Sequence, residues 1–464
     1  MTVQHNDIIH FIGVGGIGMS GIAQVLASKG YPVSGSDLKT TSITRRLSAL
    51  GVRICEGHKA ENVKDATVVV YSSAVRESNP ELQEARKRGL KIMRRAEMLA
   101  FVLGWGRSIV ISGAHGKTTT TSMVVTTLEA AGMNPTSLIG GELNDIGGNA
   151  RLGTGEWAVA EGDESDGSLV LLPADVAVVT NIDLEHLDHY PDIASVKACF
   201  RQFFKSAKPG ARYIVCADSP VALELASEFP RESVLLYGRG ENAQYQIRDL
   251  EARHDATEFS LTCEANLMGR VRVNVPGVHN ASNATAACLA AMQAGLDFEA
   301  AADGLARYRG VRRRFEFKGT VGGVTVVDDY GHHPTEITAT LATLSGYTQG
   351  RRVVIFQPHR YTRTAYLMKD FCTSFQQAKL DWLIVTEVYS AGEDPIPQAT
   401  GEHLAHEIQK GASFKVSYQP RVPDIAREIV AHINSGDTVL TLGAGDVVKA
   451  GETLLSILGG SGNA

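Results

Sequence analysis

The run of residues from Ser112 to Thr120 constrains the fold of this chain more than any other stretch. It reads Ser-Gly-Ala-His-Gly-Lys-Thr-Thr-Thr and follows the short β-branched segment 107–111. A helical pattern continues from it over residues 122–128. A glycine-rich turn between a strand and a helix predicts an α/β unit in which backbone N–H groups at the start of the helix can hold phosphate oxygens.

Two side chains of this turn carry groups that a nucleoside triphosphate requires. Lys117 can reach the β- and γ-phosphates, and the hydroxyl of Thr118 can bind Mg²⁺. The other residues of the turn that we expect to bind ATP are Gly113, His115, Gly116 and Thr119. The two glycines stand closer together than in the common phosphate loop, so a purely structural glycine-rich turn is the alternative interpretation.

Composition places the chain among globular enzymes. It has 464 residues, which favours about three domains at roughly 150 residues each. Its net charge of −6 argues against a general nucleic-acid coat, and no apolar run approaches the roughly 18 residues of a membrane span. The amino terminus lacks the pattern of a secretion signal, and the six cysteines are scattered without metal-binding spacing. We therefore expect a protein of the reducing cytoplasm.

A second glycine turn lies near the amino terminus. A strand pattern at 8–12 precedes it, and a helical stretch at 19–29 and a strand at 32–36 follow it. The turn residues that we expect to bind a ligand are Gly15, Gly16, Ile17 and Gly18, with Asp37 at the end of the second strand. This order is typical of a mononucleotide-binding βαβ unit. An NAD-dependent dehydrogenase is one interpretation, but the chain shows no separate site for hydride chemistry.

Acidic and histidine-containing segments follow two strands of the middle region. Glu161 ends the strand 157–161 and opens an acidic run, so we expect it to provide a second contact to Mg²⁺; a solvated acidic loop is the alternative. His186 follows the strand 176–180 and can bind a second metal, stabilise phosphoryl oxygens or serve structure alone. The closely spaced strand patterns later in this region, at 233–237, 258–262 and 270–275, predict a small antiparallel patch.

Polar groups gather again toward the carboxyl-terminal third. Asn280 and Asn283 precede an alanine-rich helix and could contact a nucleotide base or cap the helix. The arginine run 312–314 suits contact with phosphate, although a solvated basic turn would look similar. The segments 328–334 and 356–364 each follow a strand and are rich in groups that bind carboxylates and amines.

The order of these patterns predicts an α/β protein with three domains. We expect a Rossmann-like domain over residues 1–104, a central P-loop ATPase-type domain over 105–316 and a second Rossmann-like domain over 317–464. The predicted strands of the last domain are 324–328, 352–356, 382–386 and 438–442, alternating with helices that include 335–344 and 366–378.

Taken together, the motifs resemble the Mur ligase family of cell-wall peptide synthetases over essentially the full chain. The segments that carry the resemblance are the turn 113–119, the strand of Glu161, Asn181 with Glu185 and His186, His279 with Asn280 and Asn283, and 329–334. Within the family, residues 13–20 and 357–363 most resemble the members that add the first amino acid, L-alanine.

The resemblance implies an ATP-dependent ligase of peptidoglycan precursor synthesis. Such an enzyme joins L-alanine to the lactyl carboxylate of UDP-N-acetylmuramate through an acyl phosphate and releases ADP and phosphate. It implies ATP and Mg²⁺ as cofactors, and it indicates no oligomeric state. A recycling ligase that attaches a preformed peptide is the nearer alternative, and a nucleotide-dependent dehydrogenase is the more distant one.

The resemblance also implies roles for individual residues. The residues expected at the UDP-sugar are the turn 15–18, Asp37 and Ser73. The residues expected at ATP are those of the turn 112–120, called the phosphate turn below, together with Asn283, Arg314 and Asp329. The residues expected around L-alanine are Tyr330, His359, Arg360 and Arg363. The expected catalytic groups are Lys117, His186, His332 and His359, either of the last two serving as the base, and the expected metal ligands are Thr118, Glu161 and His186.

One departure from the broader family concerns a carbamylated lysine that several relatives carry. This sequence has Arg201 at that position, with Lys197 nearby, so no carbamate is predicted.

Overall fold

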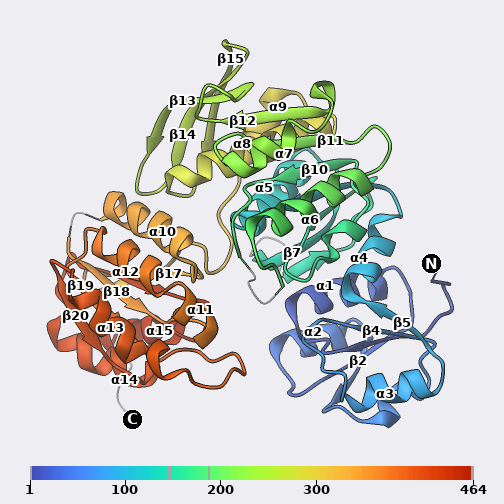
Figure 1. Cartoon of the computed structure of the whole chain (residues 1–464), viewed down its shortest axis with the longest axis horizontal. Helices are drawn as coiled ribbons and strands as arrows, with labels where there is room; N and C mark the ends of the chain where they lie inside the picture. Colours follow the sequence, from blue (N-terminus) through green and yellow to red (C-terminus); the bar gives the residue numbers. More distant parts are fainter. Residues whose placement is uncertain (1–2, 144–147, 186–188, 349, 461–464) are drawn as a thin grey trace. The chain divides into compact units, whose positions relative to one another are not determined.

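The computed structural model describes residues 3–143, 148–185, 189–348 and 350–460. Within these residues the strands form three sheets of five, ten and six strands, with helices alternating along the chain (Figure 1). The predicted α/β class is confirmed. None of the described helices has both the length and the apolar character needed to cross a membrane.

The first sheet contains the amino-terminal glycine turn. Its strand order is β3-β2-β1-β4-β5, and all of its neighbouring strands pair in parallel. The strands are β1 (Ile9–Ile12), β2 (Val33–Asp37), β3 (Arg53–Glu56), β4 (Val68–Tyr71) and β5 (Lys91–Arg94). The helices between them are α1 (Ile17–Ser28), α2 (Ser42–Ala49), η1 (Ala60–Val63) and α3 (Pro80–Lys87), and α4 (Arg95–Leu103) follows β5. The turn lies between β1 and α1, as predicted.

The second sheet has the order β15-β14-β13-β12-β11-β10-β6-β9-β7-β8. Its strands are β6 (Arg107–Ser112), β7 (Thr136–Leu143), β8 (Gly148–Arg151), β9 (Trp157–Glu161), β10 (Val176–Val179), β11 (Arg212–Cys216), β12 (Val234–Gly238), β13 (Tyr245–Ala252), β14 (Thr257–Cys263) and β15 (Asn266–Val273). Its helices are α5 (Lys117–Ala130), η2 (Ser168–Leu171), α6 (Ile193–Ser206), α7 (Pro220–Ala226), η3 (Arg231–Ser233), α8 (Val278–Gln293) and α9 (Phe298–Leu305). Strand β6, which leads into the phosphate turn, lies between β9 and β10 and pairs with both in parallel.

One prediction for this sheet was wrong. The segment 233–237 was assigned to an antiparallel patch, but β12 pairs in parallel with both β11 and β13. The physical reason is that helix α7 crosses over between β11 and β12, which returns the chain in the same direction. A short strand has no local feature that distinguishes these two pairings.

The third sheet has the order β16-β17-β21-β18-β19-β20, antiparallel between β16 and β17 and parallel elsewhere. Its strands are β16 (Glu316–Val321), β17 (Val324–Asp329), β18 (Arg352–Phe356), β19 (Trp382–Val385), β20 (Lys415–Tyr418) and β21 (Thr438–Leu442). Its helices are α10 (Pro334–Tyr347), α11 (Tyr361–Tyr366), α12 (Met368–Gln376), η4 (Pro397–Ala399), α13 (Gly401–Gln409), α14 (Val422–Ile429), η5 (Val430–His432) and α15 (Val448–Leu458). The predicted helix 366–378 is replaced by α11 and α12, which separate at Leu367 because its backbone (φ −101°, ψ 18°) leaves the helical region.

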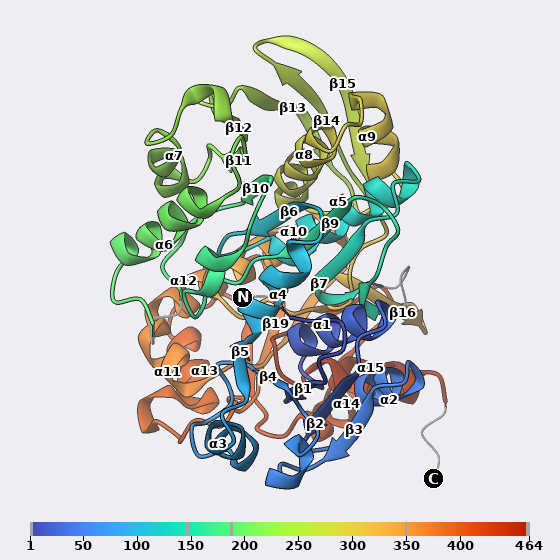
Figure 2. The ribbon, with the colours of Figure 1, turned by 90° about the vertical axis from the view of Figure 1, so that its right-hand side faces the viewer.

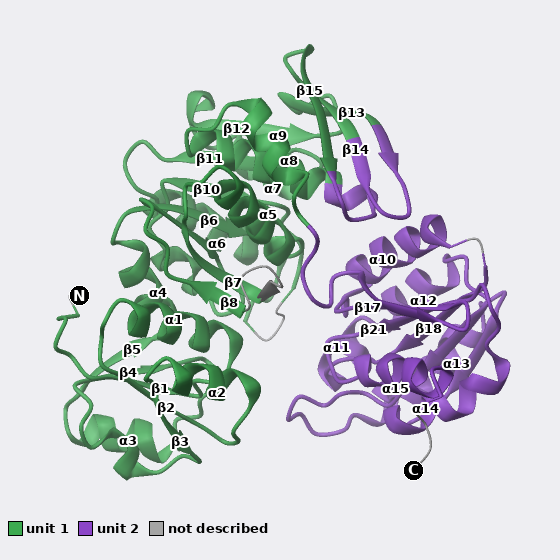
Figure 3. Cartoon of the chain, turned by 180° about the vertical axis from the view of Figure 1, so that it is seen from behind, with its two compact units in different colours: residues 1–249, 259–272, 281–308 green, residues 250–258, 273–280, 309–464 purple. Residues whose placement is uncertain are grey.

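The chain divides into two compact units (Figure 3). The first comprises residues 1–249, 259–272 and 281–308, and the second comprises 250–258, 273–280 and 309–464. The domain boundaries proposed from the sequence, at 104/105 and 316/317, remain predictions.

Within the first unit, the amino-terminal sheet and the central sheet share one core. A single cluster of buried side chains includes residues of β1 and α4 as well as residues of β9, β10 and α6. Helix α1 packs against β7 and β8 of the central sheet (Figures 1 and 2). The glycine turn is therefore anchored to the same body as the phosphate turn.

Candidate functional site

The phosphate turn lies where three parallel strands end side by side. The register aligns Ile111 of β6 with Glu161 of β9, and Ser112 of β6 with Val179 of β10. The ends of β9 and β10 therefore border the turn, as expected for a site at the carboxyl edge of a parallel sheet. Thr118 Oγ1 donates a hydrogen bond to Glu161 Oε2 at 2.9 Å.

Lys117 is held by carboxylates and by its own loop. Its Nζ donates to Glu164 Oε1 at 2.8 Å and to the carbonyl oxygens of Gly113 and Ala114 at 2.5 and 3.1 Å. Burial alone would lower the pKa of Lys117, but the charges of Glu164 and Glu161 outweigh it and raise the pKa above its ordinary value. The ammonium is therefore a permanent cation at the start of helix α5.

The two glycines of the turn have positions that other residues could not occupy without strain. Gly116 has φ +84°, and a Cβ on it would lie 2.6 Å from Asn283 Oδ1. Gly113 has φ +137°, and a Cβ there would lie 2.2 Å from Thr180 Oγ1. Asn283, which also accepts a hydrogen bond from Thr120 Oγ1 at 3.3 Å, thus packs directly against the turn. The structure brings together these residues expected at ATP.

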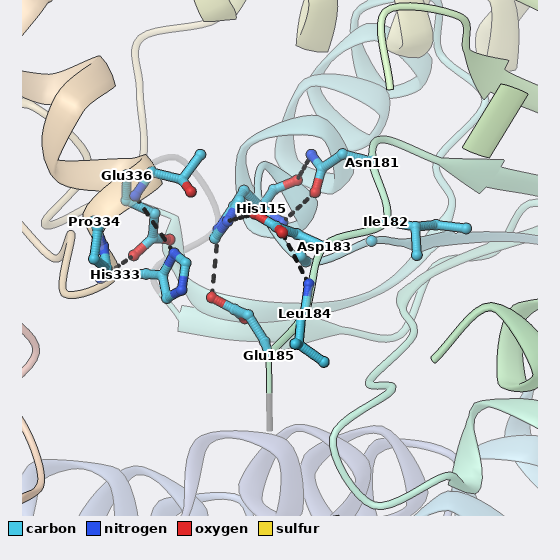
Figure 4. Close-up of polar contacts among 12 residues, drawn as sticks. His115, Asn181, Ile182, Asp183, Leu184, Glu185, His333, Pro334 and Glu336 are labelled. Atoms are coloured by element: carbon cyan, nitrogen blue, oxygen red, sulfur yellow. Dashed lines mark hydrogen bonds and ion pairs between the residues drawn. The ribbon is translucent and has the colours of Figure 1, made fainter. Parts of the chain in front are cut away.

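His115 is fixed by the loop after β10 (Figure 4). Asn181 accepts a hydrogen bond from the His115 N–H and donates one to the His115 carbonyl, both at 2.9 Å. The imidazole lies between two carboxylates, with His115 Nε2 3.7 Å from Asp183 Oδ2 and His115 Nδ1 3.7 Å from Glu185 Oε1. The predicted metal ligand His186 lies outside the described residues.

The amino-terminal glycine turn is closed by Asp37. Its Oδ2 accepts a hydrogen bond from the Gly15 N–H at 2.8 Å, so this predicted uridine contact also shapes the turn. Gly16, Ile17 and Gly18 are exposed, and Ser73 is exposed just after β4, the strand next to β1. The residues expected at the UDP-sugar thus share the carboxyl edge of one sheet.

An ion pair links this sheet to the acidic run that follows Glu161. Arg95 Nη2 donates to Asp163 Oδ2 at 2.8 Å. Burial alone would raise the pKa of Asp163, but the charges of Arg95 and Lys117 and the hydrogen bonds from Ser165 together outweigh burial and lower it. The Arg95 side chain also lies against Gly18, since a Cβ on Gly18 would be 3.2 Å from Arg95 Cδ. Arg95 therefore connects the amino-terminal glycine turn to the acidic run that follows β9.

In the second unit, the residues expected around L-alanine gather after β17 and β18. The rings of Tyr330 and His332 are 5.4 Å apart, and those of His332 and His359 are 5.8 Å apart. Arg363 Nη1 lies 3.4 Å from His359 Nδ1 and donates to the His359 carbonyl at 3.3 Å. Strands β17 and β18 both pair with β21 in parallel, so the loops that follow β17 and β18 begin at the same edge of the sheet.

Both histidines have lowered pKa values. Burial lowers the pKa of His332 to about 3, against the opposing charge of Glu336 and with help from Arg363. Burial and the neighbouring Arg363 and Arg360 guanidinium groups lower the pKa of His359 to about 4. Both imidazoles are therefore neutral at neutral pH and are weak bases in this structure.

Asp329 and Arg314, expected at ATP, have structural partners in the second unit. Asp329 is buried, and its carboxylate accepts hydrogen bonds from the N–H groups of Phe315 and Gly331, both at 2.8 Å. Burial raises the pKa of Asp329 to about 6, against the effect of Arg314. The Arg314 guanidinium lies 5.4 Å from the centre of the Tyr330 ring and 3.5 Å from Glu336 Oε1.

Sequence reasoning missed several contacts of these sites. Glu164 was part of the acidic run but was not assigned to Lys117, and Arg95 was not singled out at all. The Gly140 N–H, which donates to Glu161 Oε2 at 2.9 Å, had no sequence signal. Lys197 and Arg201 both form ion pairs with Glu228.

Comparison with known proteins matches three consecutive parts of the chain to one family. Residues 8–103 match the catalytic domain of the Mur ligase family, residues 111–291 match the Mur ligase middle domain, and residues 313–445 match the domain described as Mur ligase, glutamate ligase domain. The chain belongs to the Mur ligase family.

Individual Mur ligases are similar over nearly the full length. The UDP-N-acetylmuramate–L-alanine ligase of Syntrophus aciditrophicus is 47% identical over 450 residues, covering 97% of this chain and 93% of that protein. The enzyme of the same name from Myxococcus xanthus is 45% identical over 456 residues, covering 98% and 96%. The crystal structure of the UDP-N-acetylmuramate–alanine ligase MurC from Thermotoga maritima has a TM-score of 0.84 at 27% identity, over 98% of this chain and 100% of that chain.

Proposed function

We propose that this chain is an ATP-dependent ligase that joins L-alanine to the lactyl carboxylate of UDP-N-acetylmuramate. The reaction proceeds through an acyl phosphate, gives ADP and phosphate, and belongs to peptidoglycan precursor synthesis. The observation that carries this proposal is the 45–47% identity, over nearly the full chain, to relatives named for this activity. A murein peptide ligase from Psychrobacter arcticus shares the fold at 23% identity, which does not favour a recycling activity, and nothing favours a dehydrogenase.

The phosphate turn supplies the groups that the first half of the reaction needs. The γ-phosphoryl group of ATP passes to the lactyl carboxylate, and negative charge gathers on the oxygens of the transferred group. The permanent cation of Lys117, fixed at the start of α5, offsets that charge. Gly116 and Asn283 shape the turn so that its N–H groups can approach the phosphates.

The residues beside Lys117 also fit a magnesium ion. The Thr118 hydroxyl and the Glu161 carboxylate, whose oxygens lie 2.9 Å apart, are the hard oxygen ligands that Mg²⁺ prefers. A magnesium ion held there would supply positive charge that offsets the negative charge of the phosphate oxygens. Thr118, in the first turn of α5, and Glu161, at the end of β9, would hold it, while the assignment of a second metal to His186 stays a prediction.

The second half of the reaction needs an amine nucleophile. The α-amine of L-alanine attacks the acyl phosphate, and a base must remove its proton. His332 and His359 are neutral at neutral pH, and we propose that one of them takes this proton; because burial makes both weak bases, the proton has to move as the amine attacks the acyl phosphate. The guanidinium groups of Arg360 and Arg363 suit the α-carboxylate of the amino acid.

The glycine turn suits the UDP group. Exposed backbone N–H groups at the start of α1 can hold the diphosphate, and Asp37 and Ser73 lie at the same edge of the sheet. All six cysteines are free thiols, as a protein of the reducing cytoplasm would have them, and we place the reaction there.

The test is phosphate release as each substrate is supplied in turn. We expect release from ATP to require both UDP-N-acetylmuramate and L-alanine, and a tripeptide in place of L-alanine to give none. Lys117→Ala should lower turnover at least about 100-fold, because it removes the cation that stabilises the transferred phosphoryl group. Calorimetric titration should show that this variant still binds UDP-N-acetylmuramate. Lys87→Ala, at a side chain that is 81% exposed, is the matched control and should behave as the unaltered protein.

Release that needs no amino acid, or full activity of Lys117→Ala, would rule out the proposed reaction.

A further inference from the structure

The loop that follows β19 contacts His359 and Arg360, two of the residues expected around L-alanine, just before α11 begins. The Tyr389 N–H donates to the Pro358 carbonyl at 2.8 Å, and the Arg360 N–H donates to the Tyr389 carbonyl at 2.9 Å. These bonds form an isolated parallel bridge between His359 and Tyr389. The backbone of His359 and Arg360, in the loop between β18 and α11, is thus held by hydrogen bonds to the loop after β19.

The side chain of Tyr389 holds the ring of His359. The two rings are stacked, with centroids 5.4 Å apart and an interplanar angle of 10°. Tyr389 also packs against Gly445, where a Cβ would lie 2.9 Å from Tyr389 Cδ2. Tyr389 therefore restricts the rotation of an imidazole that the proposed reaction uses.

Glu393 contacts both Thr362 and Arg360. Its carboxylate accepts hydrogen bonds from the Thr362 N–H at 3.0 Å and from Thr362 Oγ1 at 2.8 Å. The same carboxylate lies 3.8 Å from Arg360 Nε, and its side chain is only 22% exposed. One carboxylate thus fixes both the guanidinium of Arg360 and the chain two residues beyond it.

Arg360 needs this support because its backbone is strained. It has φ +70° and ψ 131°, a conformation that residues other than glycine rarely adopt. Such strain persists only where surrounding contacts enforce it, and it is concentrated at functional sites. The contacts that enforce it here are those of Tyr389 and Glu393.

We propose that Tyr389 and Glu393 are positioning residues of the amino-acid site: Glu393 directs the Arg360 guanidinium toward the carboxylate of L-alanine, and Tyr389 sets the orientation of His359. This inference rests on the proposed function. It predicts that loss of either residue weakens the use of the amino acid while the use of ATP and the UDP-sugar is preserved.

The test compares the KM of each substrate among variants of the full chain. Glu393→Gln should raise the KM for L-alanine about tenfold and change the KM values for ATP and UDP-N-acetylmuramate less than twofold, because the amide loses the charge that holds Arg360. Glu393→Asp should recover part of the loss. Tyr389→Ala should show the same selective rise, whereas Tyr389→Phe, which keeps the stacked ring, should behave as the unaltered protein. Glu452→Gln removes an ion-paired carboxylate on α15 and is the charge-matched control.

Two results would overturn the inference: an unchanged KM for L-alanine in both Glu393→Gln and Tyr389→Ala, or a proportionate rise in all three KM values together with a lower melting temperature. Phosphate release by the unaltered protein that needs no L-alanine would show instead that the proposed function is wrong, and this result is distinguishable because it needs no variant of Tyr389 or Glu393.

Discussion

The charged state of Lys117 in the phosphate turn depends on a carboxylate from the loop that follows β9. The ammonium of Lys117 is mostly buried, and its shortest side-chain contact is the almost fully buried carboxylate of Glu164. Paired in this way, neither charge pays the full cost of leaving water. The pair therefore affects the stability of the fold as well as the chemistry of the turn.

Replacing Glu164 with Gln should lower the free energy of unfolding by about 1–3 kcal/mol, because a buried cation loses its nearest countercharge while the loop carbonyls still bind it. Urea unfolding measures this. Glu156→Gln, which breaks a surface pair with Arg107, is the control and should cost less than about 1 kcal/mol. Equal losses in the two variants would contradict the role of the buried pair.

The lowered pKa of His332 predicts how stability depends on pH. As pH falls below about 6.5, the unfolded chain binds a proton at this histidine and the folded chain does not, so the folded state loses stability down to about pH 3. At pH 5 the loss is about 2 kcal/mol. His332→Gln should remove it, so urea unfolding should favour this variant, relative to the unaltered protein, by that amount more at pH 5 than at pH 7.

His254→Gln is the control for this measurement, since water reaches a side chain that is 71% exposed. A stability difference between His332→Gln and the unaltered protein that does not change with pH would show that the folded state binds the proton as readily as the unfolded chain.

Helix α5 joins the phosphate turn to the central sheet, and glycines flank both of its ends. Gly116 precedes it with φ +84°, and Gly132 follows it with φ +76°. The two glycines share a left-handed backbone, but their surroundings differ. A Cβ on Gly116 would strike Asn283, and a Cβ on Gly132 would have nothing within 4 Å.

We expect Gly132→Ala to lower the free energy of unfolding by about 1 kcal/mol, because alanine resists a positive φ, and Gly116→Ala to lower it by more, because its Cβ also strikes Asn283. Only Gly116→Ala should also weaken ATP binding, by at least about tenfold, because Asn283 and the turn must move apart. Calorimetric titration with ATP separates the two effects. Similar ATP affinities in both variants would show that the contact with Asn283 does not shape the nucleotide site.

The first unit combines two sheets in one folded body, and buried polar contacts join them. The Asn149 side chain on β8 is buried; it accepts a hydrogen bond from Arg46 Nη2 at 3.0 Å and donates to the Ile17 carbonyl at 2.6 Å. Arg95 and Asp163 form the second link. Both links end at α1 or beside it, so packing between the sheets bears on the glycine turn.

Asn149→Ala should therefore lower the free energy of unfolding by about 1–3 kcal/mol and raise the KM for UDP-N-acetylmuramate several-fold, because the Ile17 carbonyl loses its buried donor. The KM for L-alanine should not change. Asn266→Ala, at an exposed position at the start of β15, is the control. If all KM values stay unchanged in Asn149→Ala, the contact serves stability alone.

Much of this protein could be predicted from short stretches of its sequence. Strands such as β10 and β18 are apolar runs, and Gly13, Gly113 and Gly116 mark turns, because periodicity and backbone freedom are properties of neighbouring residues. The α/β class and the family follow from such local patterns and their order. The pairing direction of β12 does not, since it depends on where α7 returns the chain.

The partners of the candidate site residues required the three-dimensional fold. Glu164 and Asn283 meet the phosphate turn from distant parts of the chain because β6, β9 and α8 converge there, and Tyr389 meets His359 because β18 and β19 are neighbours. Local sequence carries the chemical identity of each group, whereas distances, burial and pKa shifts arise only when strand order places separate segments within a few ångströms. The sequence of residues 112–120 therefore predicts a phosphate site by itself, whereas the side chains that surround this turn are determined by packing.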